Sequence, residues 1–158
     1  MATNRRDTET ATRKAAAKNI EDYVLEHQAG HMMRRAHQRH TAIFQEYITD
    51  PQLTPLQFAA LVKLRDLGEV SQNQLGRMTA MDAATMQGVI KRLSGRGLIE
   101  RRPDPDDRRR LILNLSEAGC ELIHRAVGTG HDITSQTLAP LNEAERKTFM
   151  ALLARLAE

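Results

Sequence analysis

The sequence has little cysteine and no long apolar run, and both absences narrow the class of protein. A single cysteine, Cys120, among 158 residues excludes an intramolecular disulfide framework, which fits a reducing compartment. The longest apolar runs are a few residues, far short of the ~20 that a membrane span needs. The N-terminus has no apolar signal-peptide core. We therefore expect a cytoplasmic protein that does not contact a membrane.

Common catalytic signatures are also missing. Histidine, aspartate and serine are present, but the sequence contains no nucleophile elbow and no phosphate-binding loop. His37 and His40 have a spacing that could serve a metal on a helix, yet no Cys/His/Asp cluster completes a tetrahedral set. We therefore expect no enzyme activity, no metal and no cofactor.

Charge is nearly balanced, with 23 basic and 20 acidic side chains and a formal net charge of +3. This surplus is a weak indication of an anionic partner, so the pattern of residues has to decide. Residues 1–19 are polar and carry five basic and two acidic side chains. We interpret them as a flexible basic arm, with a plain solvated tail as the alternative.

The rest of the chain shows helix periodicity and helix-start signals. Apolar residues at steps of three, four or seven predict a long helix over roughly 20–49, ended by Pro51. N-cap residues predict five later helices, beginning after Thr54, Ser71, Asp82, Ser116 and Asn142. The third short helix should run to about Arg96, with Gly97 after it.

Two alternating apolar segments, 98–102 and 111–115, predict a β-hairpin after these short helices. Pro103 and Pro105 cannot donate ladder hydrogen bonds, which places them in the connecting loop. The fold class we predict is therefore mainly α with a small β-hairpin wing.

Two short helices joined by a tight turn, the second with a polar outward face, are typical of a helix-turn-helix. The face begins with small or hydrogen-bonding residues that could read base edges, and cations that could meet phosphates follow. The candidate residues are Ala84, Thr85, Gln87, Gly88, Lys91 and Arg92.

The loop of the hairpin carries both signs of charge in the segment RRPDPDDRRR, residues 101–110. Arginine is the residue type that enters a narrow, negative minor groove, and a nearby carboxylate can hold a guanidinium in one direction. The candidate wing residues are Arg101, Asp107, Arg108, Arg109 and Arg110. Alone, the helix face and the charge run could both be solvated surface; together, in this order, they favour DNA binding.

Five motifs resemble the multiple-antibiotic-resistance regulator (MarR) family over roughly residues 25–156. They are LTPLQF at 53–58, SQNQL at 71–75, RL at 92–93 with GLI and RR at 97–102, DPDDRR at 104–109, and LSEAG at 115–119. The resemblance implies a winged helix-turn-helix homodimer whose DNA binding a small ligand weakens. It also implies that Arg109 enters the minor groove and that Asp107 positions it. Some members carry arginine where this chain has Gly88. Peroxide-sensing members use a cysteine in the first helix, so we expect Cys120 to be a small buried residue instead.

The terminal helices are amphipathic, and a small winged core has too few faces to cover them all. We therefore expect residues 20–50 and 116–158 to form a dimerisation region around a DNA-binding domain at 51–115. A twofold dimer would bury the surplus apolar stripe, which comprises Phe149, Leu152, Leu153 and Leu156. Its double-stranded DNA operator should then be an inverted repeat.

Histidines and arginines in the first long helix, beside apolar residues, suggest a pocket for a small aromatic carboxylate. The candidate residues are Met33, Arg35, His37, His40, Phe44 and Phe58. Arg34 or Arg39 could take the place of Arg35, and the alternative for each histidine is a surface or half-buried structural role.

The leading hypothesis is a repressor of a catabolic or efflux operon, relieved by a small aromatic acid or its thioester. The alternative is a nucleoid-type structural DNA-binding protein with no effector, which would discriminate poorly between sequences.

Overall fold

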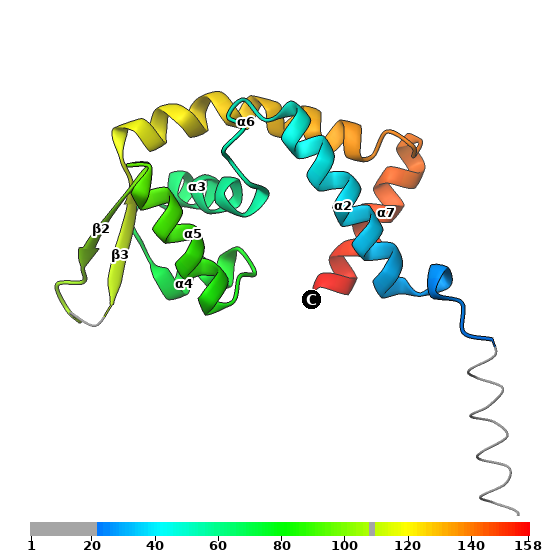
Figure 1. Ribbon diagram of the computed structural model, residues 1–158, viewed down its shortest axis with the longest axis horizontal. Helices are drawn as coiled ribbons and strands as arrows, with labels where there is room; N and C mark the ends of the chain where they lie inside the picture. Colours follow the sequence, from blue (N-terminus) through cyan, green and yellow to red (C-terminus); the bar gives the residue numbers. More distant parts are fainter. Residues whose placement is uncertain (1–21, 108–109) are drawn as a thin grey trace, which may run out of the picture. The chain divides into compact units, whose positions relative to one another are not determined.

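The computed structural model describes residues 22–107 and 110–158 (Figure 1). They divide into two units, one that ends at Gln38 and one that spans Arg39–Glu158. The basic arm predicted at 1–19 lies outside the described residues.

The long helix predicted over 20–49 is shorter than expected at its N-terminal end. A 3-10 turn, η1 (Leu25–His27), is followed by Gln28 in an extended conformation, and the α-helix α2 (Ala29–Tyr47) begins only after it. The apolar periodicity continues through this break, which is why it predicted a single helix.

Three short helices follow at the predicted positions: α3 (Pro55–Leu67), α4 (Gln72–Met78) and α5 (Ala83–Gly95). Each begins at its predicted N-cap, whose side chain accepts a hydrogen bond from the backbone amide three residues on. Helix α3 ends at Gly68, which adopts φ 71°, a left-handed conformation that glycine takes without strain.

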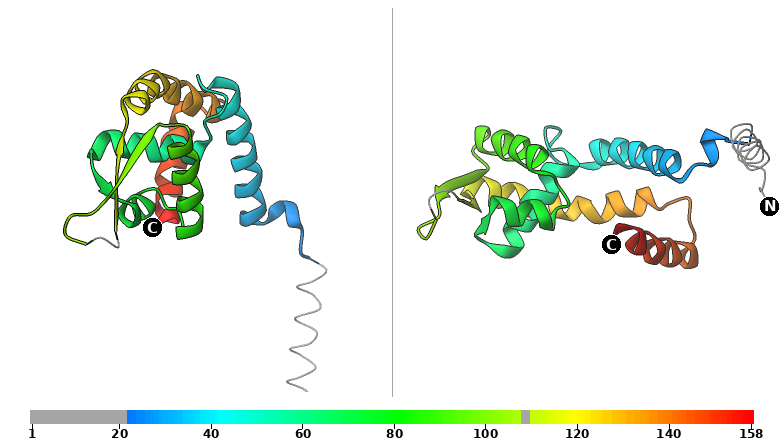
Figure 2. Two further views of the ribbon diagram at one scale, coloured as in Figure 1. Left: turned by 60° about the vertical axis from the view of Figure 1, so that its left-hand side comes forward. Right: turned by 90° about the horizontal axis from the view of Figure 1, so that it is seen from below.

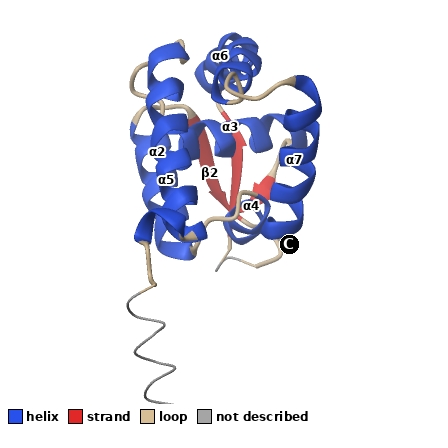
Figure 3. Ribbon diagram, turned by 90° about the vertical axis from the view of Figure 1, so that its right-hand side faces the viewer, coloured by secondary structure: helices blue, strands red, loops and turns tan. Residues whose placement is uncertain are grey.

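The sheet has three antiparallel strands in the order β1-β3-β2: β1 (Val70–Ser71), β2 (Ile99–Pro103) and β3 (Leu111–Leu115) (Figure 3). The hairpin of β2 and β3 was predicted to within a residue. Pro103, however, pairs with Leu111 rather than lying in the loop, which the edge position of β2 permits because an edge strand has one unpaired side. Strand β1 was not predicted.

Two helices complete the chain, α6 (Glu117–Thr137) and α7 (Glu143–Ala157). The predicted caps Ser116 and Asn142 both accept an amide hydrogen bond, and Asn142 forms a full capping box with Glu145. Helix α6 runs without a break through Gly128 and Gly130 near its middle. Within the described residues, no helix is long and apolar enough to span a membrane.

The second unit has a hydrophobic core in which α3 packs on α5, α6 and β3. The inward face of α5 was predicted correctly: Met86, Val89, Ile90 and Leu93 are all buried. Burial opposes ionisation of Asp50, but hydrogen bonds from Arg96 and the Gln52 amide outweigh it and keep the pKa of Asp50 low. The Asp50–Arg96 ion pair thus ties the loop before α3 to the end of α5.

Candidate DNA-binding surface

The N-terminal end of α5 and the far end of the β2–β3 hairpin lie on the same side of the second unit. The N-terminal end of α5 and the far end of the hairpin point the same way in Figure 1 and in the left view of Figure 2. A recognition helix and a wing need this arrangement, because both must reach one duplex at once.

The N-terminus of α5 is organised by Asp82 and Thr85. The Asp82 carboxylate accepts the Thr85 amide at 2.8 Å and the Thr85 hydroxyl at 2.8 Å. These two hydrogen bonds hold the pKa of Asp82 below its usual range, and the bond from the Thr85 amide has the larger effect. Because the Thr85 hydroxyl hydrogen is directed at Asp82, the side chain offers its oxygen lone pairs and its methyl group to a partner.

The six residues predicted to face outward on α5 are all at least partly exposed. Ala84, Gln87, Lys91 and Arg92 are exposed, whereas Thr85 and Gly88 are half-buried. The guanidinium of Arg92 lies over Gly88: a Cβ at Gly88 would be 3.5 Å from Nη2 and 3.7 Å from Nη1 of Arg92. Sequence reasoning had assigned Arg92 to phosphates and had not anticipated this contact, although the spacing of four residues was available to indicate it.

The wing tip is closed by Asp104, a residue that sequence reasoning did not select. Asp104 is only 9% exposed, and its carboxylate accepts the Asp106 amide at 3.0 Å and lies 3.8 Å from Nε of Arg110. Backbone bonds close the same loop, from the Asp104 amide to the Arg110 carbonyl and from the Arg110 amide to the Asp107 carbonyl. Arg110 is therefore held by Asp104 as well as by the backbone.

The remaining wing residues differ in their surroundings. Arg101 is exposed on β2 and pairs with buried Leu113 on β3. Its neighbour Arg102 donates to Glu69 at 2.6 Å, which raises the pKa of the guanidinium and fastens β2 to the segment before β1. Arg108 and Arg109 lie outside the described residues, so the predicted pair of Asp107 with Arg109 stays a prediction.

The predicted effector residues fall into both units. Met33, Arg35 and His37 are exposed residues of the first unit. In the second unit, the buried ring of Phe44 meets the half-buried ring of Phe58 edge-on, with centroids 5.7 Å apart. His40 Nδ1 lies 3.0 Å from the Thr137 hydroxyl.

Arg39 serves the end of α6. Its guanidinium donates to the carbonyls of Thr137 at 2.6 Å and Gln136 at 3.1 Å. Cations at a helix C-terminus satisfy carbonyls that the helix leaves unpaired. Of the three arginines considered for a carboxylate ligand, Arg39 thus already has a structural role.

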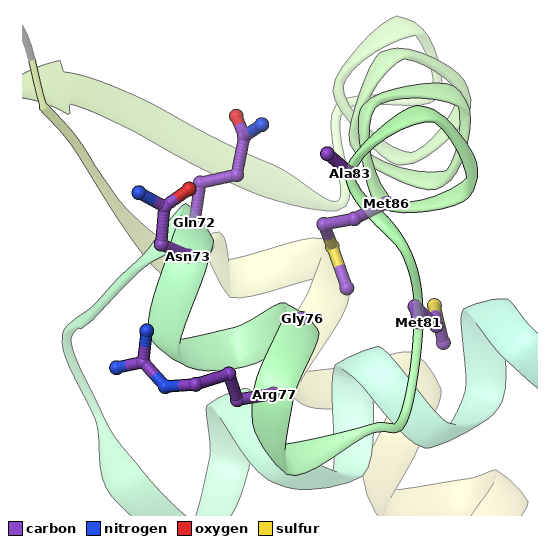
Figure 4. A pocket seen from close by; sticks show the side chains of 7 residues that line it. All are labelled: Gln72, Asn73, Gly76, Arg77, Met81, Ala83 and Met86. Atoms are coloured by element: carbon purple, nitrogen blue, oxygen red, sulfur yellow. The ribbon is translucent and has the colours of Figure 1, made fainter.

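A cavity of about 250 Å³ lies elsewhere, between α4 and the start of α5 (Figure 4). Met81 and Met86 line it on one side, and Gln72, Asn73 and Arg77 line it from α4. It is smaller than the roughly 300–1,000 Å³ of most ligand pockets, and none of the six predicted effector residues lines it.

Two further observations concern reactive side chains. Cys120 is exposed rather than buried, which contradicts the expectation from sequence. Within residues 22–107 and 110–158, no three His, Cys, Asp or Glu side chains are placed to share a metal ion.

Comparison with known proteins finds regulators that bind DNA, as the arrangement of α5 and the hairpin indicates. The family model described as "MarR family" matches residues 53–111, from the residue before the cap of α3 to the start of β3. The HTH-type transcriptional repressor NicR of Pseudomonas putida is 42% identical over 136 residues, 86% of each chain.

Solved structures show the same fold. A probable transcriptional regulator from Pseudomonas aeruginosa is 50% identical, with a TM-score of 0.80 over 84% of this chain and 99% of that one. BpsR of Bordetella bronchiseptica, whose DNA binding is described as regulated by 6-hydroxynicotinic acid, is 43% identical, with a TM-score of 0.76 over 83% and 99%. With this identity over most of both chains, the protein belongs to the MarR family of transcriptional regulators.

Proposed function

We propose that this protein is a homodimeric repressor that binds an inverted-repeat operator and releases it when a small aromatic acid binds. The observation that carries the proposal is the common orientation of the α5 N-terminus and the wing. The regulated genes would form a catabolic or efflux operon, and the protein would act in the cytoplasm, where the DNA is.

The dimer would form through the segments at 20–50 and 116–158, leaving 51–115 to bind DNA. Helix α7 supports this division, because its apolar stripe is exposed in the single chain. Phe149 is 41% exposed, Leu152 50%, Leu153 38% and Leu156 76%. A second copy of the chain would bury this stripe and place two recognition helices about 34 Å apart, one turn of DNA.

In the DNA complex, α5 would enter the major groove and the wing the adjacent minor groove. Thr85 and Gln87 would meet base edges, with Ala84 and Gly88 allowing close approach, and Lys91 would meet a phosphate. Arg109 would enter the minor groove, positioned by Asp107, while Arg101, Arg108 and Arg110 would contact the flanking backbone.

The effector would be a hydroxylated pyridine carboxylate. This class is the one named for BpsR, and NicR is a repressor of comparable similarity. The half-buried ring of Phe58, packed edge-on against buried Phe44, offers an aromatic edge and His40 a polar group, which together suit a flat ring with hydrogen-bonding substituents. Met33, Arg35 and His37 stay predictions as effector-binding residues, and a thioester of the acid stays an alternative ligand.

Selection of bound sequences from a randomised duplex pool tests operator binding against the structural, nucleoid-type alternative. We expect an enriched inverted repeat that binds at least 10³-fold more tightly than random duplex at one salt concentration. A ratio near one would favour the structural alternative.

A further inference from the structure

Gly88 has no explanation within the fold. It lies inside a 13-residue helix, where glycine costs about 1 kcal/mol relative to alanine. Its φ is not positive, and an added Cβ would meet only the flexible end of Arg92, at 3.5 Å or more, which is ordinary van der Waals contact. Neither backbone conformation nor packing therefore requires glycine at this position.

The outer side of α5 gives Gly88 a role. Long side chains on a helix lean toward its N-terminus, so Arg92 reaches back one turn. The missing side chain at Gly88 leaves a notch, and the Arg92 guanidinium lies across it, with Nη2, Nη1 and Cζ 3.5, 3.7 and 3.9 Å from the Cβ position. The notch thus brings a planar cation onto the segment that also carries Thr85 and Gln87.

This position suits base reading better than phosphate binding. A guanidinium held this close to the helix at Gly88 lies nearer the floor of a groove than one that extends sideways to the strand, as a phosphate contact needs. Among major-groove edges, guanine offers two adjacent acceptors, O6 and N7, which match the fork of arginine.

We propose that Gly88 and Arg92 act as a unit that reads one guanine in each half of the operator, with Arg92 donating to O6 and N7 and Gly88 providing the space. The inference rests on operator binding as proposed above and assigns to it the base that this part of α5 selects. Lys91, the adjacent exposed cation, would make the phosphate contact instead.

Repeating the selection with Arg92→Ala, Arg92→Lys and Gly88→Leu tests the unit. We expect wild type to enrich guanine at one position of each half-site, and all three variants to lose that preference while the rest of the repeat is kept. Arg92→Lys keeps the charge but not the fork, so its affinity for the guanine site should fall roughly 5- to 150-fold with little change for a site with another base there.

Lys91→Ala is the matched contrast, because a lost phosphate contact weakens all sequences alike and lowers the salt slope by about 1. Gly88→Leu raises helix propensity, so folding, checked by circular dichroism, should be preserved.

Uniform weakening and a lower salt slope in Arg92→Ala would overturn the inference and make Arg92 a phosphate contact. A guanine preference that survives all three substitutions would overturn it as well, while leaving operator binding intact. A wild-type protein that enriches no sequence would overturn the proposed function and this inference together.

Discussion

Replacing Asp104 with alanine should loosen the wing tip and weaken operator binding without unfolding the protein. The carboxylate accepts the Asp106 amide at 3.0 Å in a side chain that is 12% exposed, and a hydrogen bond to a charged group contributes about 1.5–3 kcal/mol. The more distant pair with Arg110, whose side chain is 54% exposed, adds at most about 1 kcal/mol.

The loss should appear mainly in binding. A wing tip that is disordered in the free protein must be ordered on DNA, so the lost local stabilisation becomes a cost of association. Taking the lower end of the range, we expect Asp104→Ala to bind its selected duplex about tenfold more weakly than the matched control.

Asp104→Asn is that control, because it removes the same negative charge but retains an oxygen that can accept the Asp106 amide. Comparing the two variants at one salt concentration by fluorescence anisotropy cancels the change in general attraction to DNA. The salt slopes of the two should agree, since neither residue contacts a phosphate. Equal affinities would refute the assignment of Asp104 as the residue that closes the wing.

Three further predictions follow from contacts in the second unit. Gly119→Ala would place a Cβ 2.0 Å from the Leu98 carbonyl oxygen, so it should lower the free energy of unfolding by about 1–3 kcal/mol in urea titrations, whereas Cys120→Ala should stay within about 0.5 kcal/mol; similar values for both would be contrary. Thr85→Val keeps the amide bond to Asp82 but removes the hydroxyl, and with it the bond to the exposed Asp82 carboxylate and the oxygen lone pairs, so the melting temperature should fall only slightly while base preference near that residue changes; an unchanged selected sequence would count against base contact. Leu153→Glu should convert the dimer to monomer in sedimentation experiments, while Lys147→Glu, on the opposite face of α7, should not; a dimer in both would exclude α7 from the interface.

The helices were largely predictable because their signals are local. An N-cap residue and apolar residues three and four positions apart act within one or two turns, so the starts of α3 to α7 followed from sequence alone. Strand β1 was not predicted because it has only two residues, and because its pairing of Val70 with Leu113 joins segments far apart in the chain.

In the candidate DNA-binding surface too, features set by local sequence were predictable and features set by how the loop folds were not. Outward residues of α5 could be read from helix periodicity, and the Arg92–Gly88 contact was within reach of the same rule. The role of Asp104 depends on how the hairpin loop closes, which residue types in the segment RRPDPDDRRR did not reveal. Charge of both signs indicated pairing there, but only coordinates select Asp104 as the acceptor for the Asp106 amide.

The most direct test of a ligand-responsive repressor is a titration of the protein–operator complex with 6-hydroxynicotinic acid at fixed salt. If the acid binds the DNA-free arrangement more tightly, operator affinity should fall at least fivefold, and the melting temperature of the free protein should rise with ligand concentration. Benzoic acid, which lacks the ring nitrogen and the hydroxyl group, should act more weakly at equal concentration. An operator affinity that is the same with and without saturating 6-hydroxynicotinic acid would contradict control by this class of ligand.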